Sequence, residues 1–420
     1  MQRRAVAPCL LALTALSPLG CAHRNHKLVA QIDEAITRAA EFMVGQQGDD
    51  GAWRSNVYGV FRDGASLTPH VLTTLHAVHD LTPGGPEAFR SGADYFASLS
   101  AAEEDPHLAY PVYSAAPAVW LLSLENPENY VHARSVYLRA VLERHFTMEN
   151  EWLPSDPAFG GWGYSTGVPT RRRDRAWLGD ANISATVYAL GAVRAARASS
   201  ADSIRRDALR FVQRCQNFAD HGSEDEPLFD DGGFFFSPVD PARNKAGVAG
   251  TDRRGRERYA SYGSATADGL RALLQCGLPM DHPRVVAARN WLERNFTATS
   301  NPGQFRPECE VLRDGYYYYY CWSVAHAFRA LGQRKVSTKH GRVDWATTLV
   351  EELLRRQRAD GGWANTFTDA KEDDPLVATP FATAALALCR CSLLRSSSAG
   401  RCGHMPARGG PLCQGGPGDH

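Results

Sequence analysis

A seven-residue motif with the spacing Gln-x-x-x-Gly-x-Trp occurs near both ends of the chain. It covers Gln47–Trp53 and Gln357–Trp363, and weaker copies lie at Asp156–Trp162 and Leu228–Phe234. A motif that returns along a chain is typical of a repeat architecture. The glycine allows a sharp turn after a helix, the ring can pack on neighbouring repeats, and the Gln amide can bond unpaired groups at a helix end. We assign to the structural repeat motif Gln47, Gly51, Trp53, Gly160, Trp162, Gly232, Phe234, Gln357, Gly361 and Trp363.

The segments between these copies have the periodicity of helices. The first helix of each pair is amphipathic and charged, as in Leu349–Arg356, whereas the second is small and apolar nearly all round, as in Asn182–Val193 and Thr379–Cys389. Outer helices that alternate with buried inner ones predict a closed double ring of about six hairpins, an all-α (α/α)6 barrel or toroid with the motif turns along one rim. No run alternates convincingly enough to predict a strand. About twelve helices are expected near Lys27–Gln46, Thr68–Leu81, Pro86–Leu99, Val112–Leu124, Ala133–His145, Asn182–Ala196, Ser203–Gln216, Gly263–Cys276, Pro283–Phe296, Tyr318–Leu331, Trp345–Arg356 and Pro380–Leu394.

Composition allows a large core and excludes one class of partner. The chain has 420 residues and 44% hydrophobic content, which is enough for one big domain or two ordinary ones. Lys plus Arg and Asp plus Glu number 46 each, so no whole-chain field favours nucleic acid or an acidic partner. We expect no nucleic-acid binding, and we find no strong signal for an oligomer.

The N-terminus has the pattern of an export signal. Arg3 and Arg4 precede an apolar run over residues 5–19 that is too short for a comfortable transmembrane helix, and Gly20 and Cys21 follow. This pattern resembles a bacterial lipoprotein signal and predicts cleavage and lipidation at Cys21, with ordinary cleaved export and a mere apolar start as alternatives. We therefore expect a membrane-anchored lipoprotein of the cell envelope. Its parts would be a signal at 1–20, a short linker at 21–26, the toroid at 27–395 and a disordered Gly/Pro-rich tail at 396–420.

The motif, the hairpin count and the two helix types together resemble the prenyltransferase and squalene-oxidase repeat family. That family includes the squalene–hopene cyclases and the β subunits of protein prenyltransferases. The resemblance covers about Lys27 to Leu394 and includes Asp156–Tyr164, Gly179–Asn182 and Tyr262–Thr266. It implies a terpenoid-cyclase-like toroid with an apolar central cavity, and an apolar or isoprenoid-like small molecule as its ligand.

The zinc chemistry that the resemblance implies for prenyltransferases lacks its residues here. In those β subunits, zinc is held by the Asp and Cys of an Asp-Gly-Cys segment and by a distant His. The segment Cys309–Tyr316 matches, but Tyr316 stands at the position of the metal cysteine, and no histidine occurs between Asp374 and Arg390. One carboxylate is not a zinc site. We therefore expect no metal and no cofactor. The positions expected to bind a diphosphate through cations or a His hold Tyr262, Glu308 and Val311.

The acid of the cyclases is also missing from its expected place. Class II cyclases use an Asp-x-Asp-Asp motif at the start of an inner helix as general acid, and this motif occurs nowhere in the chain. If catalysis persists, we expect another carboxylate to face the cavity with a raised pKa. The positions of the motif hold Asn182, Ser184 and Ala185 on one inner helix, and Tyr262, Ser264 and Ala265 on another.

The starts of the inner helices provide the candidate ligand-binding residues Asp180, Tyr262, Asp314 and Tyr317. The five tyrosines of Tyr316–Tyr320 could line the cavity with their π faces, or pack between helices and hydrogen-bond at the rim. Carboxylates at these starts, which also include Asp268 and Asp374, more often cap helices than act as acids.

Two further groups have a structural and a functional interpretation each. Arginine clusters precede two inner helices and could bind a phosphate or an anionic headgroup, or be solvated loops. His76 and His79 are spaced for a metal pair, but no third ligand is evident, so helix packing is favoured. The clusters are Arg171, Arg172, Arg173 and Arg175, and Arg253, Arg254, Arg256 and Arg258.

Three function classes remain open. The first is a toroid that binds a lipid, an isoprenoid-like ligand or a protein without the known chemistry, and the second is a divergent squalene–hopene-cyclase-like isomerase. The third is a carbohydrate-active toroid with two carboxylates across the cleft, which rests on analogy of fold alone. The side chains that face the cavity discriminate among them.

Overall fold

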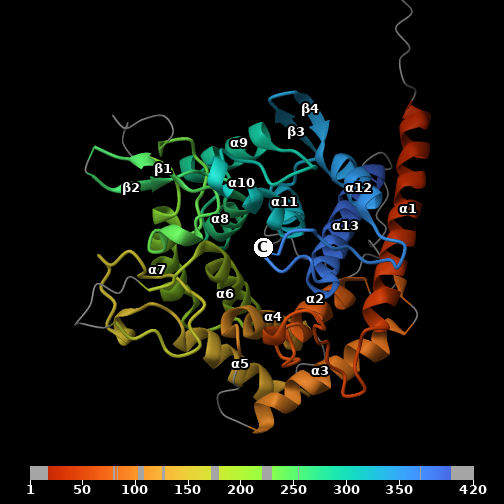
Figure 1. The fold of residues 1–420 in the computed structure, drawn as a ribbon, viewed down its shortest axis with the longest axis horizontal. Coiled ribbons are helices and arrows are strands. Elements are labelled where there is room, and N and C mark those ends of the chain that lie inside the picture. The colour runs from red at the N-terminus through yellow and green to blue at the C-terminus, as the bar shows by residue number, and fades with distance from the viewer. Residues whose placement is uncertain are drawn as a thin grey trace, which may run out of the picture.

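A computed structural model describes residues 18–78, 81–82, 84–102, 108–124, 128–171, 179–219, 229–253, 255–368 and 370–398. Within these ranges the helices form two concentric layers (Figure 1). The inner helices are α2 (Thr68–Val78), α4 (Pro111–Leu124), α6 (Ile183–Ala195), α8 (Gly263–Gln275), α11 (Tyr317–Ala330) and α13 (Pro375–Ser398). The outer helices are α1 (Pro18–Val44), α3 (Gly85–Ala102), α5 (Val131–Glu143), α7 (Ala201–Arg214), α9 (Pro283–Asn295) and α12 (Trp345–Arg356), and a short helix α10 (Glu310–Gly315) precedes α11.

The inner layer is a closed ring. Each inner helix contacts the next one in chain order, and α13 contacts both α11 and α2, so that the last inner helix meets the first. On the outside, α1 packs on α13, α5 on α4, and α9 on α8. The predicted (α/α)6 toroid is therefore confirmed.

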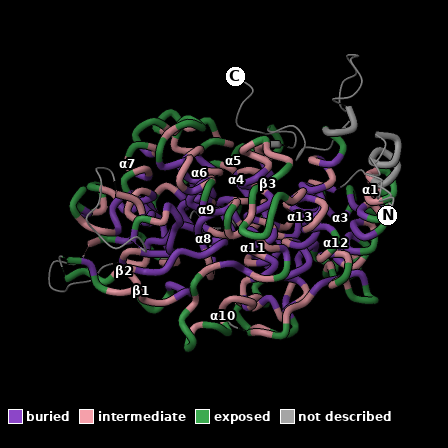
Figure 2. Tube along the Cα trace, turned by 90° about the horizontal axis from the view of Figure 1, so that it is seen from above, coloured by how far each residue is buried: buried purple, intermediate pink, exposed green. Residues whose placement is uncertain are grey.

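Burial explains why the helices divide into these layers. Helix α6 buries most of its residues on all sides, including Ser184 and Thr186, because it has neighbours all round. Helix α7 buries a single face that consists of Ile204, Ala208, Phe211 and Val212, as an amphipathic surface helix does. Figure 2 shows the same division, with buried segments gathered inside and exposed ones at the surface.

Helix α13 illustrates the inner type. Residues Pro375–Arg395 are long and apolar enough to cross a membrane by length and composition, but 83% of the relevant window is buried inside the protein. Its apolar surface is covered by neighbouring helices, so we assign it to the core.

The motif turns hold consecutive outer helices together. The Gln47 amide donates to the carbonyl of Gly51 and to that of Ala88 in α3, both at 2.8 Å. The Gln357 amide donates to Gly361 and to Ala35 in α1, again both at 2.8 Å. Because α1 is the first outer helix, the last motif joins the end of the ring to its beginning.

The aromatic residue of each motif also has one recurring partner. The indole N–H groups of Trp53, Trp162 and Trp363 donate to carbonyls near the end of the preceding outer helix, at 2.7 to 2.8 Å. These bonds satisfy carbonyls that a helix end leaves without an intrahelical partner.

The motif glycines are required by both backbone and space. Gly51, Gly160, Gly232 and Gly361 have φ between +82° and +89°. A Cβ atom at Gly361 would lie 2.5 Å from the carbonyl oxygen of Arg38 in α1, and the other three would collide in the same way with the next outer helix. Any side chain here would push neighbouring repeats apart.

Three local features differ from the sequence predictions. Helix α1 begins at Pro18, so residues 21–26, which were expected as a linker, continue this helix. Two antiparallel hairpins were missed, β1 (Val248–Thr251) with β2 (Glu257–Tyr259) and β3 (Lys335–Thr338) with β4 (Gly341–Asp344). Their strands of three or four residues are too short for an alternating pattern to stand out. Of the predicted signal at residues 1–20, residues 1–17 lie outside the described residues, as do residues 399–420 of the predicted tail.

Candidate ligand-binding cavity

The ring encloses a cavity of about 430 Å³. Its wall is built mainly by the N-terminal halves of the inner helices and by the loops that lead into them, so segments from all six repeats meet there. A volume of this size suits a small organic molecule. The lining residues are Phe61, Ser66, Leu67, His70, Tyr110, Tyr113, Pro117, Tyr164, Ser184, Tyr188, Phe236, Arg243, Lys245, Tyr262, Ser264, Ala265, Asp268, Tyr316, Tyr319, Ala370, Lys371, Glu372, Val377 and Phe381.

Aromatic rings form a large part of this wall. The ring of Tyr113 stacks on that of Tyr164, with centroids 5.4 Å apart, and Tyr319 meets Phe381 edge-on at 5.2 Å. The hydroxyl groups of Tyr188 and Tyr262 have no hydrogen-bond partner within the described residues. The wall thus offers broad apolar faces with a few polar tips, a combination that suits an extended apolar ligand.

Among the described residues, Asp268 is one of two buried carboxyl groups that line the cavity. It lies on α8 and is 1% exposed. Its carboxylate accepts hydrogen bonds from the hydroxyls of Tyr319 at 2.6 Å and Ser323 at 2.5 Å, and Arg271 lies 3.3 Å from it. Burial raises the pKa of Asp268, while the charge of Arg271 and the two hydroxyls oppose the rise. The sequence left a structural cap and a general acid as alternatives for this residue, and its position on the cavity wall is compatible with the second.

Glu372 also borders the cavity, but its two oxygens are engaged. They accept hydrogen bonds from the backbone N–H groups of Tyr318 at 2.9 Å and Tyr319 at 2.7 Å, in the first turn of α11. The helix has no cap from its own N-cap side chain, so Glu372 satisfies donors that the helix start leaves open. Burial raises the pKa of Glu372 to about 7, although the hydrogen bonds from the two backbone N–H groups oppose this rise.

Lys245 presents the opposite charge. It is 8% exposed, and its Nζ lies 3.3 Å from the ring centroid of Phe236 and 4.9 Å from that of Tyr316. Burial and, to a smaller extent, the positive charge of Arg243 lower the pKa of Lys245 to about 7. The loop is fixed by Asn244, whose side chain accepts from the N–H groups of Phe236 and Ser237.

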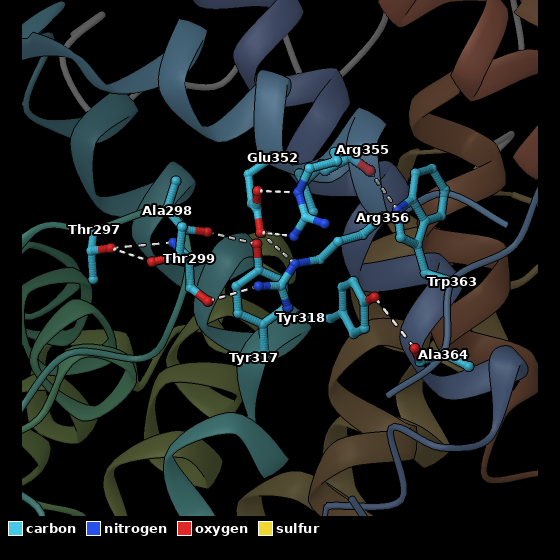
Figure 3. Close-up of polar contacts among 11 residues, drawn as sticks. Thr297, Ala298, Thr299, Tyr317, Tyr318, Glu352, Arg355, Arg356, Trp363 and Ala364 are labelled. Carbon is cyan, nitrogen blue, oxygen red and sulfur yellow. Dashed lines mark hydrogen bonds and ion pairs between the residues drawn. The ribbon is translucent and has the colours of Figure 1, made fainter. Parts of the chain in front are cut away.

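The tyrosine run is divided between the two roles that the sequence left open. Tyr316 and Tyr319 line the cavity. The hydroxyls of Tyr317, Tyr318 and Tyr320 instead donate to backbone carbonyls of Ala298, Ala364 and Thr297 respectively. Figure 3 shows Tyr317 in this outer position, where the guanidinium of Arg356 lies 3.8 Å from its ring centroid.

The four candidate ligand-binding residues are thus not brought together. Tyr262 lines the cavity, but Asp180, Asp314 and Tyr317 are not among its lining residues. Asp180 accepts from the N–H of Tyr164 at 2.7 Å and from Ser165, which fixes the loop before α6. Whether any of the four binds a ligand remains a prediction.

The other sequence candidates have structural partners. His76 packs between the rings of Phe89 and Trp120, whereas His79 lies outside the described residues. No cluster of three or more His, Cys, Asp or Glu side chains in the described part of the chain could hold a metal ion. Of the arginine clusters, Arg171 pairs with Asp156 and Arg256 pairs with Asp252.

Among the cavity residues that sequence reasoning missed, Lys245 and Glu372 are charged and buried. Both lie in loops, where no helical period indicates the side of the chain that faces inward. The only available signal was a single lysine after the aromatic segment Phe234–Phe236, in a stretch rich in small residues.

Comparisons with known proteins agree with this architecture. No protein-family model matches the sequence, and no curated protein is detectably similar to it. Solved structures do match. The type II terpene cyclase MstE from Scytonema, in complex with its substrate geranylgeranyl dihydroxybenzoate, superposes with a TM-score of 0.52 at 13% identity, over 87% of this chain and 99% of that chain. The chain has a terpenoid-cyclase-like toroid fold.

The fold is shared with a second kind of enzyme. The GH76A α-1,6-mannanase from Salegentibacter sp. HEL1_6 matches with a TM-score of 0.54 at 10% identity, over 86% of this chain and 99% of that chain. At such identities the likeness concerns the fold alone, and the function depends on the residues of the cavity.

Proposed function

We propose that the central cavity binds an apolar small molecule of the isoprenoid class. The observation that carries this proposal is the wall itself, in which ten of the lining side chains are Phe or Tyr. Burial of apolar surface stabilises such a complex by about 25 cal/mol per Å². The MstE complexes, one with geranylgeranyl dihydroxybenzoate and one with the product merosterolic acid A, are compatible with a ligand of this kind.

A carbohydrate ligand is less well supported. Hydrolysis of a glycosidic bond uses two carboxyl groups that flank it, one of which must be available as nucleophile or base. Glu372 is held by two backbone N–H groups, and Asp268 by two hydroxyls, so neither is a free base.

The proposal is tested by measuring binding of geranylgeraniol, a C20 isoprenoid alcohol, by isothermal titration calorimetry. Tyr188→Ala removes a ring from the wall without leaving a protein group unsatisfied, and we expect binding to weaken about 10-fold or more. Tyr317→Phe is the matched control, because this ring lies outside the cavity, and its affinity should equal that of the wild type. Failure of the wild type to bind, or tighter binding of α-1,6-mannotriose, would refute the proposal.

A cyclase activity is the second candidate, and the position of Asp268 favours it. A carboxyl group on the cavity wall with a raised pKa is the feature that a surviving general acid requires. Incubation with geranylgeraniol or squalene, followed by mass spectrometry, would reveal an isomeric product. Activity that persists in Asp268→Asn would remove Asp268 from the role of acid.

We also propose export and a lipid anchor at Cys21, on the basis of the N-terminal pattern alone. A disulfide bond at Cys391 is compatible with an oxidising compartment. Metabolic labelling with an alkyne-bearing palmitate should label the wild type, and Cys21→Ala should abolish the label.

A further inference from the structure

Lys245 is the most buried of the Lys and Arg side chains that line the cavity, and it has no anionic partner within the described part of the chain. Lys371, which also lines the cavity and forms no ion pair among the described residues, is only partly buried, and its Nζ lies 5.5 Å from the ring centroid of Tyr58. Arg243 pairs with Asp240, with 2.8 Å between Nε and Oδ2. Lys245 forms no ion pair or conventional hydrogen bond with any residue that the structure describes, and its recorded direct contacts are the faces of Phe236 and Tyr316. A buried ammonium in this setting has N–H groups that only a molecule in the cavity could satisfy.

The nearest negative charge does not fill this role. Asp268 influences Lys245 through its field, but it lies beyond ion-pair distance and is already engaged by Arg271 and two hydroxyls. Both side chains line the same cavity, so Lys245 can receive a negatively charged group there without losing an existing ion pair.

The number of cations indicates which anion fits. A diphosphate requires several fixed cations, and Arg243 is already neutralised by Asp240. One buried, unpaired ammonium matches one negative charge, and the surrounding rings of Phe236 and Tyr316 can cover an apolar chain attached to that charge.

We propose that Lys245 binds the carboxylate of an amphipathic ligand whose apolar part occupies the aromatic cavity. This inference rests on the proposed function and specifies the chemical class of its ligand, an isoprenoid acid. The carboxylate accepts hydrogen bonds from Nζ, and the apolar chain extends along the tyrosine-lined wall.

The test compares two probes with the same C20 chain, geranylgeranoic acid and geranylgeraniol, by calorimetry at pH 6. We expect the wild type to bind the acid about 10- to 100-fold more tightly than the alcohol, as is typical of a charge-assisted hydrogen bond. Lys245→Met keeps the length of the side chain and should lose this preference while its affinity for the alcohol is retained. Lys335→Met, on the exposed start of β3, is the control and should keep the preference.

The pH dependence provides an independent readout. The charged groups nearest Lys245 are Arg243 and Asp240 on its own loop and Asp268 on α8, and Tyr316 is the nearest titratable ring. Because the pKa of Lys245 is about 7 in the free protein, affinity for the acid should fall towards tenfold per pH unit above pH 7, and affinity for the alcohol should stay level.

The outcomes separate the two proposals. If neither probe binds, the proposed function fails and this inference fails with it. If the alcohol binds but the acid has no advantage, or if Lys245→Met keeps the advantage, the role of Lys245 is wrong and the apolar cavity stands.

Discussion

His145 occupies the place that glutamine holds in the other motif turns, and this difference makes one repeat sensitive to acid. Its Nε2 lies 3.2 Å from the carbonyl oxygen of Gly160, as the amides of Gln47, Gln216 and Gln357 lie close to their motif glycines. Its ring stacks on Trp162 with centroids 3.8 Å apart. Burial lowers the pKa of His145 to about 3.

The effect of His145→Gln follows from the geometry of the other turns. In those turns the glutamine amide also donates to a second carbonyl, which belongs to the next outer helix. This carbonyl lies three residues before the residue that contacts the motif glycine; in the first turn, for example, Ala88 accepts the bond and Ser91 contacts Gly51. The corresponding carbonyl in the turn of His145 belongs to Ile204, three residues before Asp207. The variant therefore gains a second acceptor and loses the stacked ring, and we expect a net change within about 1 kcal/mol at pH 7.5.

The difference should grow in acid, with a sign that is fixed by linkage. In the unfolded chain a histidine takes up its proton near pH 6.5, whereas in the folded protein His145 stays neutral down to about pH 3. Protonation therefore favours the unfolded state from pH 6.5 downward, by about 1.4 kcal/mol per pH unit. The free energy of unfolding of His145→Gln minus that of the wild type should therefore be about 2 kcal/mol larger at pH 5.0 than at pH 7.5.

Urea unfolding followed by circular dichroism, at both pH values and for both proteins, measures this quantity. The other buried groups that titrate in this range, among them His70 and Glu372, are present in both proteins and cancel in the difference. If the two proteins lose stability in parallel between pH 7.5 and pH 5.0, His145 is not held neutral by burial and the reasoning is wrong.

Two further predictions concern the ring and the start of α11, and both are measured by urea unfolding. Gly361 and Gly277 have nearly equal φ, +88° and +92°, but an added Cβ meets α1 only at Gly361. We therefore expect Gly277→Ala to lower the free energy of unfolding by about 1 kcal/mol, and Gly361→Ala to lower it by at least about 2 kcal/mol more. Equal losses of stability would contradict the proposed clash. The folded pKa of Glu372, about 7, lies above its ordinary value of 4.5, so the stability that its proton contributes is present below pH 4.5 and is lost as the pH rises through 7. Relative to the wild type, Glu372→Gln should therefore gain up to about 3 kcal/mol between pH 4.5 and pH 8. A stability difference that is independent of pH would show that folding does not raise the pKa of Glu372.

The ring could be predicted from the sequence because its signals are local and repeated. Helical periodicity separated the two layers, and the motif identified the turns that clasp them. Both weaker copies lacked a glutamine at the expected spacing, and in one of them the glutamine, Gln216, lies sixteen residues before Gly232. A longer loop separates the two, although Gln216 bonds both Gly232 and Arg284 of α9 as the other glutamines do. Spacing alone cannot detect a bond that spans an insertion.

The cavity could be predicted only as an apolar space, because its polar groups depend on helix phase and loop path. Of five consecutive tyrosines, only Tyr316 and Tyr319 face inward, and their spacing of three residues fits one face of a helix start. The sequence does not reveal which of the faces of such a run turns inward. Lys245 depends on a loop fixed by Asn244, and no periodic pattern marks it.

The placement of charge along the wall bears on which chemistry the cavity can perform. Aromatic faces stabilise a cation only where another cation does not already lie over them. The rings of Phe236 and Tyr316 face Lys245, and that of Tyr164 faces Arg243 at 4.5 Å. A carbocation beside these three rings would meet like charge, whereas a carboxylate there would be attracted.

The part of the wall around Tyr188 and Phe381 has the reverse preference. Within the described residues no cation lies over these two rings, and Arg271, whose charge acts on Tyr188, is paired with Asp268, whose carboxyl lines the same cavity. If Asp268 protonates a bound isoprenoid acid, positive charge should therefore develop beside Tyr188 and Phe381, with the carboxylate held at Lys245. A product cyclised at the end that bears the carboxylate would contradict this orientation, because it would place the cation against the ammonium.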